Sequence, residues 1–299
     1  MTEHEDQVHD NNDVEALPAL DKDRFEEQTI GGETGYFDKV EKLFISKRSF
    51  RTLMEEILPS HDSTSSHPEL DLDIILQKSR SRVSRNLKLV GSLGKDSYSQ
   101  VFLSYLSRSF LLKNRNRRET MAILYVDLVG STAMTAVLSP DQLVNIVRIF
   151  CQEMSIKISG RRGYVLKYAG DAVIGYFPND PDTKAACESA TRCAFDMKRM
   201  IEDSLNVVLL QYGYPKLRTR IAVDVGENQI LVLGSDPDLL GHVISRAAKI
   251  MGRARPNQIV IGGNVFKNIG KDLRGRFTEI EKYNLVETGE SYPVYRSGD

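Results

Sequence analysis

Two aspartates, each beside a glycine-marked turn at the end of an apolar run, are the residues of this chain best suited to chemistry. Asp127 closes the apolar run 121–126, and Asp171 follows Gly170 at the end of the run 164–169. Short β-branched runs are typical of strands, and glycine marks tight turns. The two carboxylates can converge only if their strands are neighbours in one sheet. Converging carboxylate oxygens suit a hard divalent cation such as Mg²⁺, usually beside nucleotide phosphates. The alternative is two aspartates that merely cap turns.

The composition excludes several classes of protein. With 299 residues, the chain has room for one sizeable domain plus an appendage, or for two small domains. Its 40 basic and 41 acidic residues nearly balance, which argues against a protein that binds nucleic acid or a membrane surface. No apolar stretch approaches the roughly 20 residues of a membrane span, and the acidic N-terminus lacks the order of a signal peptide. The three cysteines lack metal-site spacing, so we expect reduced core thiols and a cytoplasmic protein.

The N-terminal part of the chain has two expected regions. Residues 1–35 are acidic and poor in apolar periodicity, so we expect them to be largely disordered. Residues 36–118 are expected to be a helical regulatory or dimerising region of unknown type. Its first helix would cover residues 36–58, and further helices would lie between residues 70 and 118 around a polar turn.

From residue 119 to residue 299 the pattern alternates between strands and helices. The predicted strands are 121–127, 164–169, 172–177, 218–225, 229–234 and 258–262, and the predicted helices are 140–158, 183–204 and 239–251. This order, β-α-β-β-α-β-β-α-β, predicts an α+β domain in which helices cover one mostly antiparallel sheet.

Three segments of this region resemble the class III nucleotidyl cyclases, the adenylate and guanylate cyclase family. They are residues 125–132, 167–173 and 220–227, which occur in the family's order, and the resemblance extends over residues 119–297. It implies a ferredoxin-like catalytic domain that works as a head-to-tail homodimer with active sites at the subunit interface. It also implies two Mg²⁺ or Mn²⁺ ions per site and a nucleoside triphosphate as substrate.

The resemblance assigns one wall of the site to metal and phosphate. Asp127 and Asp171 match the metal-binding pair, with the carbonyl of Leu128 as a further ligand. The phosphates would be bound by backbone N–H groups at the start of the helix that follows Leu128. These N–H groups belong to Val129, Gly130, Ser131 and Thr132.

Two further residues match the family's base selectors. Lys167 lies four residues before Asp171, and Asp238 precedes the segment 239–241. A lysine that donates to purine N1 and an aspartate that accepts from the exocyclic amine would select adenine, so ATP is the expected substrate. The alternatives are a solvent-facing strand lysine and, for Asp238, a helix N-cap.

The remaining wall departs from the family. Ser245 and Lys249 stand where the family has an asparagine that orients the ribose and an arginine that stabilises the transition state. Their i, i+4 spacing puts both on one helical face, whereas Arg246 points about 100° away and is a poor replacement. The hydrogen-bonding side chain of serine is shorter than that of asparagine. Lysine keeps the positive charge of arginine but cannot bind two phosphate oxygens at once with a planar guanidinium.

These residues predict an adenylate cyclase in which Ser245 and Lys249 act in catalysis. The alternative is a weak or inactive cyclase-homology domain that serves as a nucleotide-binding regulatory or interaction module. Residues 284–295 resemble the family's closing hairpin, and Lys282 is the nearest candidate for a lysine that contacts the triphosphate.

Overall fold

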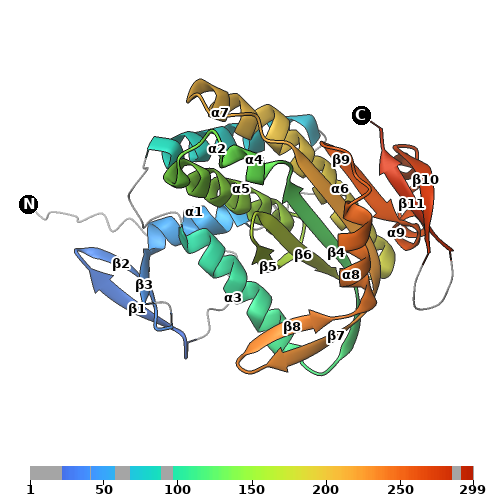
Figure 1. Ribbon diagram of the computed structural model, residues 1–299. Coiled ribbons are helices and arrows are strands. Elements are labelled where there is room, and N and C mark those ends of the chain that lie inside the picture. The colour runs from blue at the N-terminus through green and yellow to red at the C-terminus, as the bar shows by residue number, and fades with distance from the viewer. Residues whose placement is uncertain (1–21, 41, 58–67, 89–96, 285–290, 299) are drawn as a thin grey trace, which may run out of the picture. The chain divides into compact units, whose positions relative to one another are not determined.

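The computed structural model describes residues 22–40, 42–57, 68–88, 97–284 and 291–298 (Figure 1). The chain forms two compact units, and the division falls between Glu55 and Glu56.

The first unit contains a small antiparallel sheet followed by a helix. Strands β1 (Phe25–Ile30), β2 (Glu33–Asp38) and β3 (Leu43–Ser46) pair in that order, and α1 (Lys47–Ile57) follows. Gly31 and Gly32 have φ of +61° and +83°, as the two-residue turn between β1 and β2 requires. The prediction of disorder is therefore wrong for residues 25–35, and the prediction of a helix is wrong for residues 36–46. Residues 1–21 lie outside the described residues.

The second unit is built on an eight-stranded sheet. Its strands are β4 (Arg118–Leu128), β5 (Tyr164–Ala169), β6 (Ala172–Pro178), β7 (Thr219–Leu233), β8 (Asp236–Leu240), β9 (Gln258–Gly262), β10 (Phe277–Asn284) and β11 (Ser291–Ser297). The order is β10-β11-β9-β7-β4-β6-β5, and β8 pairs with β7. Among the described strand pairs of this sheet, β7 and β9 are parallel and all the others are antiparallel, which confirms the predicted mostly antiparallel sheet.

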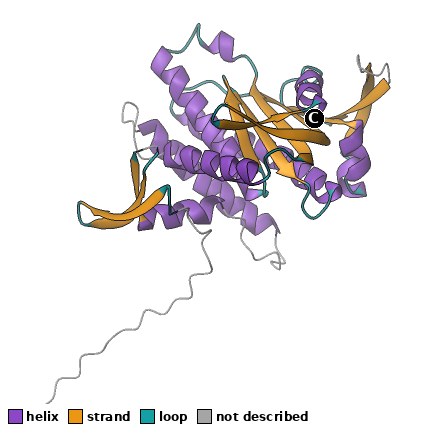
Figure 2. Cartoon of the chain, turned by 90° about the horizontal axis from the view of Figure 1, so that it is seen from below, coloured by secondary structure: helices purple, strands orange, loops and turns teal. Residues whose placement is uncertain are grey.

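Helices lie against both faces of this sheet (Figure 2). They are α2 (Pro68–Lys88), α3 (Ser97–Lys113), α4 (Ser131–Met134), α5 (Pro140–Gly160), α6 (Thr183–Met200), the π-helix η1 (Ile201–Leu205), α7 (Asn206–Gln211), α8 (His242–Met251), α9 (Gly263–Asn268) and α10 (Lys271–Arg274). Buried side chains of α2, α5 and α6 form a core with one face, and those of α3 and α8 form a second core with the other. In the described part of the chain, no helix has the length and apolarity needed to cross a membrane.

Two element predictions in this unit differ from the structure. The predicted strands 218–225 and 229–234 are one continuous strand, β7, because the polar residues between them pair with the start of β4. Residues 236–240 form β8, which folds back on β7 after Gly234 at φ +64°, so the helix begins at His242 rather than at residue 239.

Candidate active site

The two aspartates lie at the same end of neighbouring strands. Asp127 is the penultimate residue of β4, and Asp171 occupies the turn between β5 and β6, just after Gly170 at φ +65°. Strands β4 and β6 pair antiparallel, and the last pair toward this end is Val126 with Val173. The strands that carry the two carboxylates are thus neighbours, as the sequence predicts.

The two aspartates offer the oxygen ligands that a hard cation prefers. The Oδ2 atom of Asp171 is buried and has no hydrogen-bond partner, and such an atom calls for a positively charged or donating group. Asp127 Oδ2 lies 2.8 Å from Nη2 of Arg220, a residue to which the sequence analysis assigned no role. No cluster of three or more His, Cys, Asp or Glu side chains occurs among the described residues. The donor set would therefore be two carboxylates, the carbonyl of Leu128 at the end of β4, and oxygens of the substrate.

The negative charge of Asp171 also affects the buried thiol of Cys151. The pKa of the Cys151 thiol is raised to about 12, first by burial and then by the negative charge of Asp171. Cys151 lies on α5, so the carboxylate of Asp171 lies near the core beneath that helix.

One of the four backbone N–H groups expected to bind phosphate already has a hydrogen-bond partner within the protein. Gly130 has φ +81° and precedes the short helix α4, whose first N–H groups have no acceptor within the helix. The N–H of Val129, however, donates to the carbonyl of Arg218 at 2.7 Å. The expectation that Val129 offers its N–H to phosphate is thus wrong for this conformation, and Gly130, Ser131 and Thr132 remain.

The two expected base selectors contact each other. Lys167 Nζ on β5 lies 2.7 Å from Oδ2 and 3.0 Å from Oδ1 of Asp238 on β8. The side chains are 45 % and 32 % exposed, so a ligand can reach both. Asp238 belongs to a strand, and the alternative of a helix N-cap is therefore wrong.

Ser245 and Lys249 are both exposed on α8, one helical turn apart. Arg246 is turned elsewhere, as expected from its position on the helix. Its guanidinium forms an ion pair with Asp224 on β7 and donates to the carbonyl of Val225 at 3.2 Å.

Asp224 is the centre of a buried network that the sequence analysis missed. Its side chain is fully buried, and Tyr292 on β11 donates to Oδ1 at 2.6 Å. The guanidinium of Arg246 also lies 4.3 Å from the centroid of the Tyr292 ring. This network joins α8 to β7 and β11, and so fixes the helix that carries Ser245 and Lys249. One signal was present, because Asp224 lies two residues after the apolar Ala222 on the same face of the strand, and a buried carboxylate requires a partner.

Comparisons with known proteins identify the family of this fold. Residues 114–292 match the family described as the adenylate and guanylate cyclase catalytic domain. The relatives include a cytidylate cyclase from Staphylococcus aureus, 26 % identical over 61 % of this chain and 45 % of that protein. They also include adenylate cyclase 1 of Rhizobium meliloti (strain 1021), 23 % identical over 56 % of this chain and 28 % of that protein. The chain spans less than half the length of these two relatives.

Solved structures show the same fold. The adenylyl cyclase CyaB from P. aeruginosa has a TM-score of 0.51 and 19 % identity over 61 % of this chain and 95 % of that one. The guanylyl cyclase Cya2 has a TM-score of 0.55 and 18 % identity over 61 % of this chain and 93 % of that one. Because the family match covers more than half of the chain, the protein belongs to the adenylate and guanylate cyclase catalytic domain family, the class III nucleotidyl cyclases.

Proposed function

We propose that the protein is an adenylate cyclase that converts ATP to cyclic AMP and pyrophosphate for intracellular signalling. The observation that carries the proposal is the exposed contact between Lys167 and Asp238. Adenine presents an acceptor at N1 and a donor at its amino group, which an ammonium and a carboxylate can bind together. Guanine presents the reverse pattern, with a donor at N1 and an acceptor at O6. Its N1–H would face the lysine ammonium, and its O6 would face the aspartate carboxylate, so neither hydrogen bond could form.

The reaction needs a free ribose hydroxyl and a leaving pyrophosphate. The 3′ oxygen forms a bond to the α-phosphorus, the bond from that phosphorus to the bridging oxygen of the β-phosphate breaks, and the hydroxyl proton passes to solvent. Asp127, Asp171 and the Leu128 carbonyl would hold the two Mg²⁺ or Mn²⁺ ions, which when bound lower the pKa of the hydroxyl and neutralise phosphate charge. Backbone N–H groups of Gly130, Ser131 and Thr132 would face the outer phosphates.

The second wall would come from the other subunit of a homodimer. Ser245 would orient the ribose with a single hydroxyl, and Lys249 would place a positive charge near the α-phosphate. The buried contacts of Arg246 support this role, because they fix α8 while leaving Ser245 and Lys249 exposed.

Product analysis tests the proposal. Purified protein is incubated with ATP, GTP, CTP or UTP, each with Mg²⁺ or Mn²⁺, and the cyclic nucleotides are identified by mass spectrometry. CTP is included because a cytidylate cyclase is among the relatives. We expect cyclic AMP to dominate. Dominant cyclic CMP or cyclic GMP would overturn the base assignment, and no product from a folded dimer would overturn the enzymatic proposal.

A nucleotide-binding module without turnover is the second candidate, and the unusual residues Ser245 and Lys249 favour it. The double variant Ser245→Asn/Lys249→Arg separates the two candidates. A gain of about tenfold or more in kcat, the worth of one charge-assisted hydrogen bond, would show that the native pair limits an active enzyme. Retained nucleotide binding with no turnover in either form would favour the module. Lys184→Arg, an exposed change on α6, is the matched control.

A further inference from the structure

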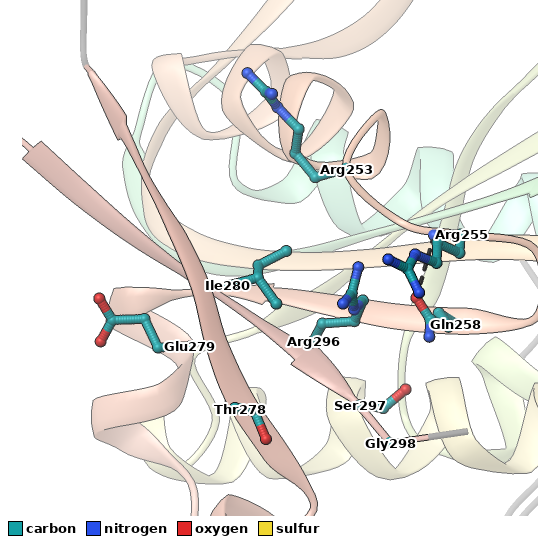
Figure 3. Close-up of a pocket in the computed structure, with 9 residues that line it drawn as sticks. All are labelled: Arg253, Arg255, Gln258, Thr278, Glu279, Ile280, Arg296, Ser297 and Gly298. Carbon is teal, nitrogen blue, oxygen red and sulfur yellow. Dashed lines mark hydrogen bonds between the residues drawn. The ribbon is translucent and has the colours of Figure 1, made fainter.

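A hollow with a basic lining lies beside the end of α8. It has a volume of about 750 Å³, and its lining includes Arg253, Arg255, Gln258, Arg296 and Ser297. This volume falls within the range of ligand sites, roughly 300–1,000 Å³. In Figure 3 the side chains of Arg255 and Arg296 extend toward each other, whereas that of Arg253 extends away from them.

The hollow carries an excess of positive charge. Three arginines line it, and the single carboxylate among its described lining residues is that of Glu279. Glu279 is hydrogen bonded to Tyr295, whose ring stacks on Phe266 at 3.8 Å between centroids and packs against the core of the opposite sheet face. No described carboxylate forms an ion pair with Arg255 or Arg296, although other arginines of this unit, such as Arg161 and Arg192, have such partners. A net positive charge concentrated here, in a chain whose formal charge is −1, favours an anionic ligand.

The floor of the hollow is polar as well. Gln258 and Ser297 are both buried, with 5 % and 4 % exposure. The Gln258 side-chain carbonyl accepts from the Arg255 N–H at 3.3 Å, and the Ser297 hydroxyl accepts from the Ile259 N–H at 3.1 Å. These bonds hold the loop after α8 against β9 and β11, which gives the two facing arginines a fixed base.

The hollow lies on the same face of the sheet as Asp127, but at some distance from it. Asp127 pairs with Arg220 on β7, and Arg220 pairs with Gln258 on β9, so the three side chains share one face. Two strand spacings separate Asp127 from Gln258, which is about 10 Å. A ligand in the hollow would therefore not occupy the place expected for the metal ions.

We propose that this hollow binds a phosphate-type anion with more than one negative charge, with Arg255 and Arg296 binding its oxygens through their planar guanidinium groups. Arginine suits such a ligand because its fork matches two phosphate oxygens at once. The site is independent of the proposed adenylate cyclase activity. Inorganic phosphate and pyrophosphate share the chemistry that it recognises.

Calorimetric titration of the full chain tests the proposal. Metal-free protein at low ionic strength is titrated with pyrophosphate in one arm and with inorganic phosphate in the other, which distinguishes the two sources. We expect binding in at least one arm, and a loss of about tenfold or more in affinity in Arg255→Gln/Arg296→Gln. The variant Arg255→Lys/Arg296→Lys, which keeps the charge but not the fork, should give an intermediate loss.

Two controls make the result specific. Arg118→Gln/Arg192→Gln removes two positive charges from exposed positions elsewhere and should leave the affinity within about twofold. Asp127→Asn/Asp171→Asn removes the expected metal ligands and should retain the binding. Absence of binding in both arms, or equal affinity in the Arg255→Gln/Arg296→Gln variant and the parent, would overturn the proposal. Neither result depends on whether the protein makes a cyclic nucleotide.

Discussion

In the proposed function Lys167 and Asp238 would act on the nucleotide base together, because the two side chains contact each other. Lys167→Gln removes one charge-assisted hydrogen bond, worth roughly 1.5–3 kcal/mol, so we expect kcat/KM for ATP to fall about 10- to 100-fold. Asp238→Asn should have a similar effect. The double variant should lose less than the product of the two single losses, because the residues are in direct contact.

Steady-state kinetics with ATP and GTP measure these effects. Lys184→Gln, an exposed lysine on α6, is the control and should change kcat/KM by less than about twofold. Independent, multiplicative losses would show that Lys167 and Asp238 do not act on the base together.

Arg220 places a positive charge directly on one expected metal ligand. Its Nη2 lies 2.8 Å from Asp127, where a divalent cation would be repelled by it. An interaction of about 1 kcal/mol is expected between partly exposed charges, so Arg220→Gln should raise the affinity for Mn²⁺ about fivefold. Electron paramagnetic resonance of free Mn²⁺, without nucleotide, measures this affinity. Arg218→Gln is the neighbouring control, and a lower affinity in Arg220→Gln would mean that Arg220 instead orients Asp127.

At the scale of elements, α2 is joined to α5 by a buried ion pair. Arg82 Nε lies 2.7 Å from Glu153 Oε1, and Arg82 Nη2 lies 2.7 Å from Oε2. Ser79 donates to Glu153 at 2.8 Å, and Ser204 donates to Ser79 at 2.7 Å. Both charged side chains are at most 6 % exposed. Helix α2 is therefore part of the same packed unit as the eight-stranded sheet.

This pair yields a prediction about stability. Arg82→Met leaves Glu153 buried without its cation and should lower the free energy of unfolding by about 3–5 kcal/mol. The double variant Arg82→Met/Glu153→Leu should recover most of that loss, since neither charge remains buried. Urea unfolding measures both values. Arg199→Met, which breaks the partly exposed pair with Asp203, is the control and should cost about 1 kcal/mol or less. A loss of that small size in Arg82→Met would contradict a structural role for the pair.

The elements that the sequence predicts well are those with long, buried apolar runs. The predicted strands 172–177 and 258–262 agree with β6 and β9 to within one residue, because such runs pack on both faces of the sheet. The strands of the first unit were missed because their side chains are largely exposed and alternate poorly, so the apolar residues of successive short strands imitate a helical spacing.

The site shows the same division between local and long-range signals. Asp127 and Asp171 were predictable, since each lies in a local strand-and-turn pattern. The contact between Lys167 and Asp238 was not predictable from local pattern, because it depends on β8 folding back along β7, which brings Asp238 to Lys167 on β5. The network of Asp224, Arg246 and Tyr292 joins residues 68 positions apart and arises only when α8 and β11 pack on β7.

At the scale of the whole molecule, buried acids that resist ionisation make stability fall in alkali. Burial raises the pKa of the Cys151 and Cys187 thiols from 9.0 to about 12, and it raises that of Cys193 as well. The unfolded thiols lose their protons above about pH 9, while the folded ones keep them up to about pH 12. Stability should thus be unaffected by these groups below pH 9 and fall as the pH rises from 9 to 12, by about 1.4 kcal/mol per pH unit for each thiol.

Urea unfolding between pH 8 and pH 11 measures this slope. Cys187→Ala should reduce the slope by the share of one thiol, after correction for its lower stability at pH 8. Native protein at pH 8 should also fail to react with a thiol reagent until it is denatured, since the three cysteines are free and buried. A flat stability profile above pH 9 would contradict the burial of these thiols.

The two walls of the proposed site offer a test of assembly that no single chain can satisfy. If each site combines Asp127 and Asp171 of one subunit with Ser245 and Lys249 of the other, a mixed dimer of two defective chains contains one intact site. Asp127→Asn/Asp171→Asn and Ser245→Ala/Lys249→Ala should each lose nearly all activity alone. Co-expressed with different tags and purified through both, the mixed dimer should recover about half of the parent kcat, because one of its two sites is intact. A doubly tagged dimer of two Asp127→Asn/Asp171→Asn chains is the control and should stay inactive. A mixed dimer that forms but shows no recovery would mean that the sites are not shared between subunits.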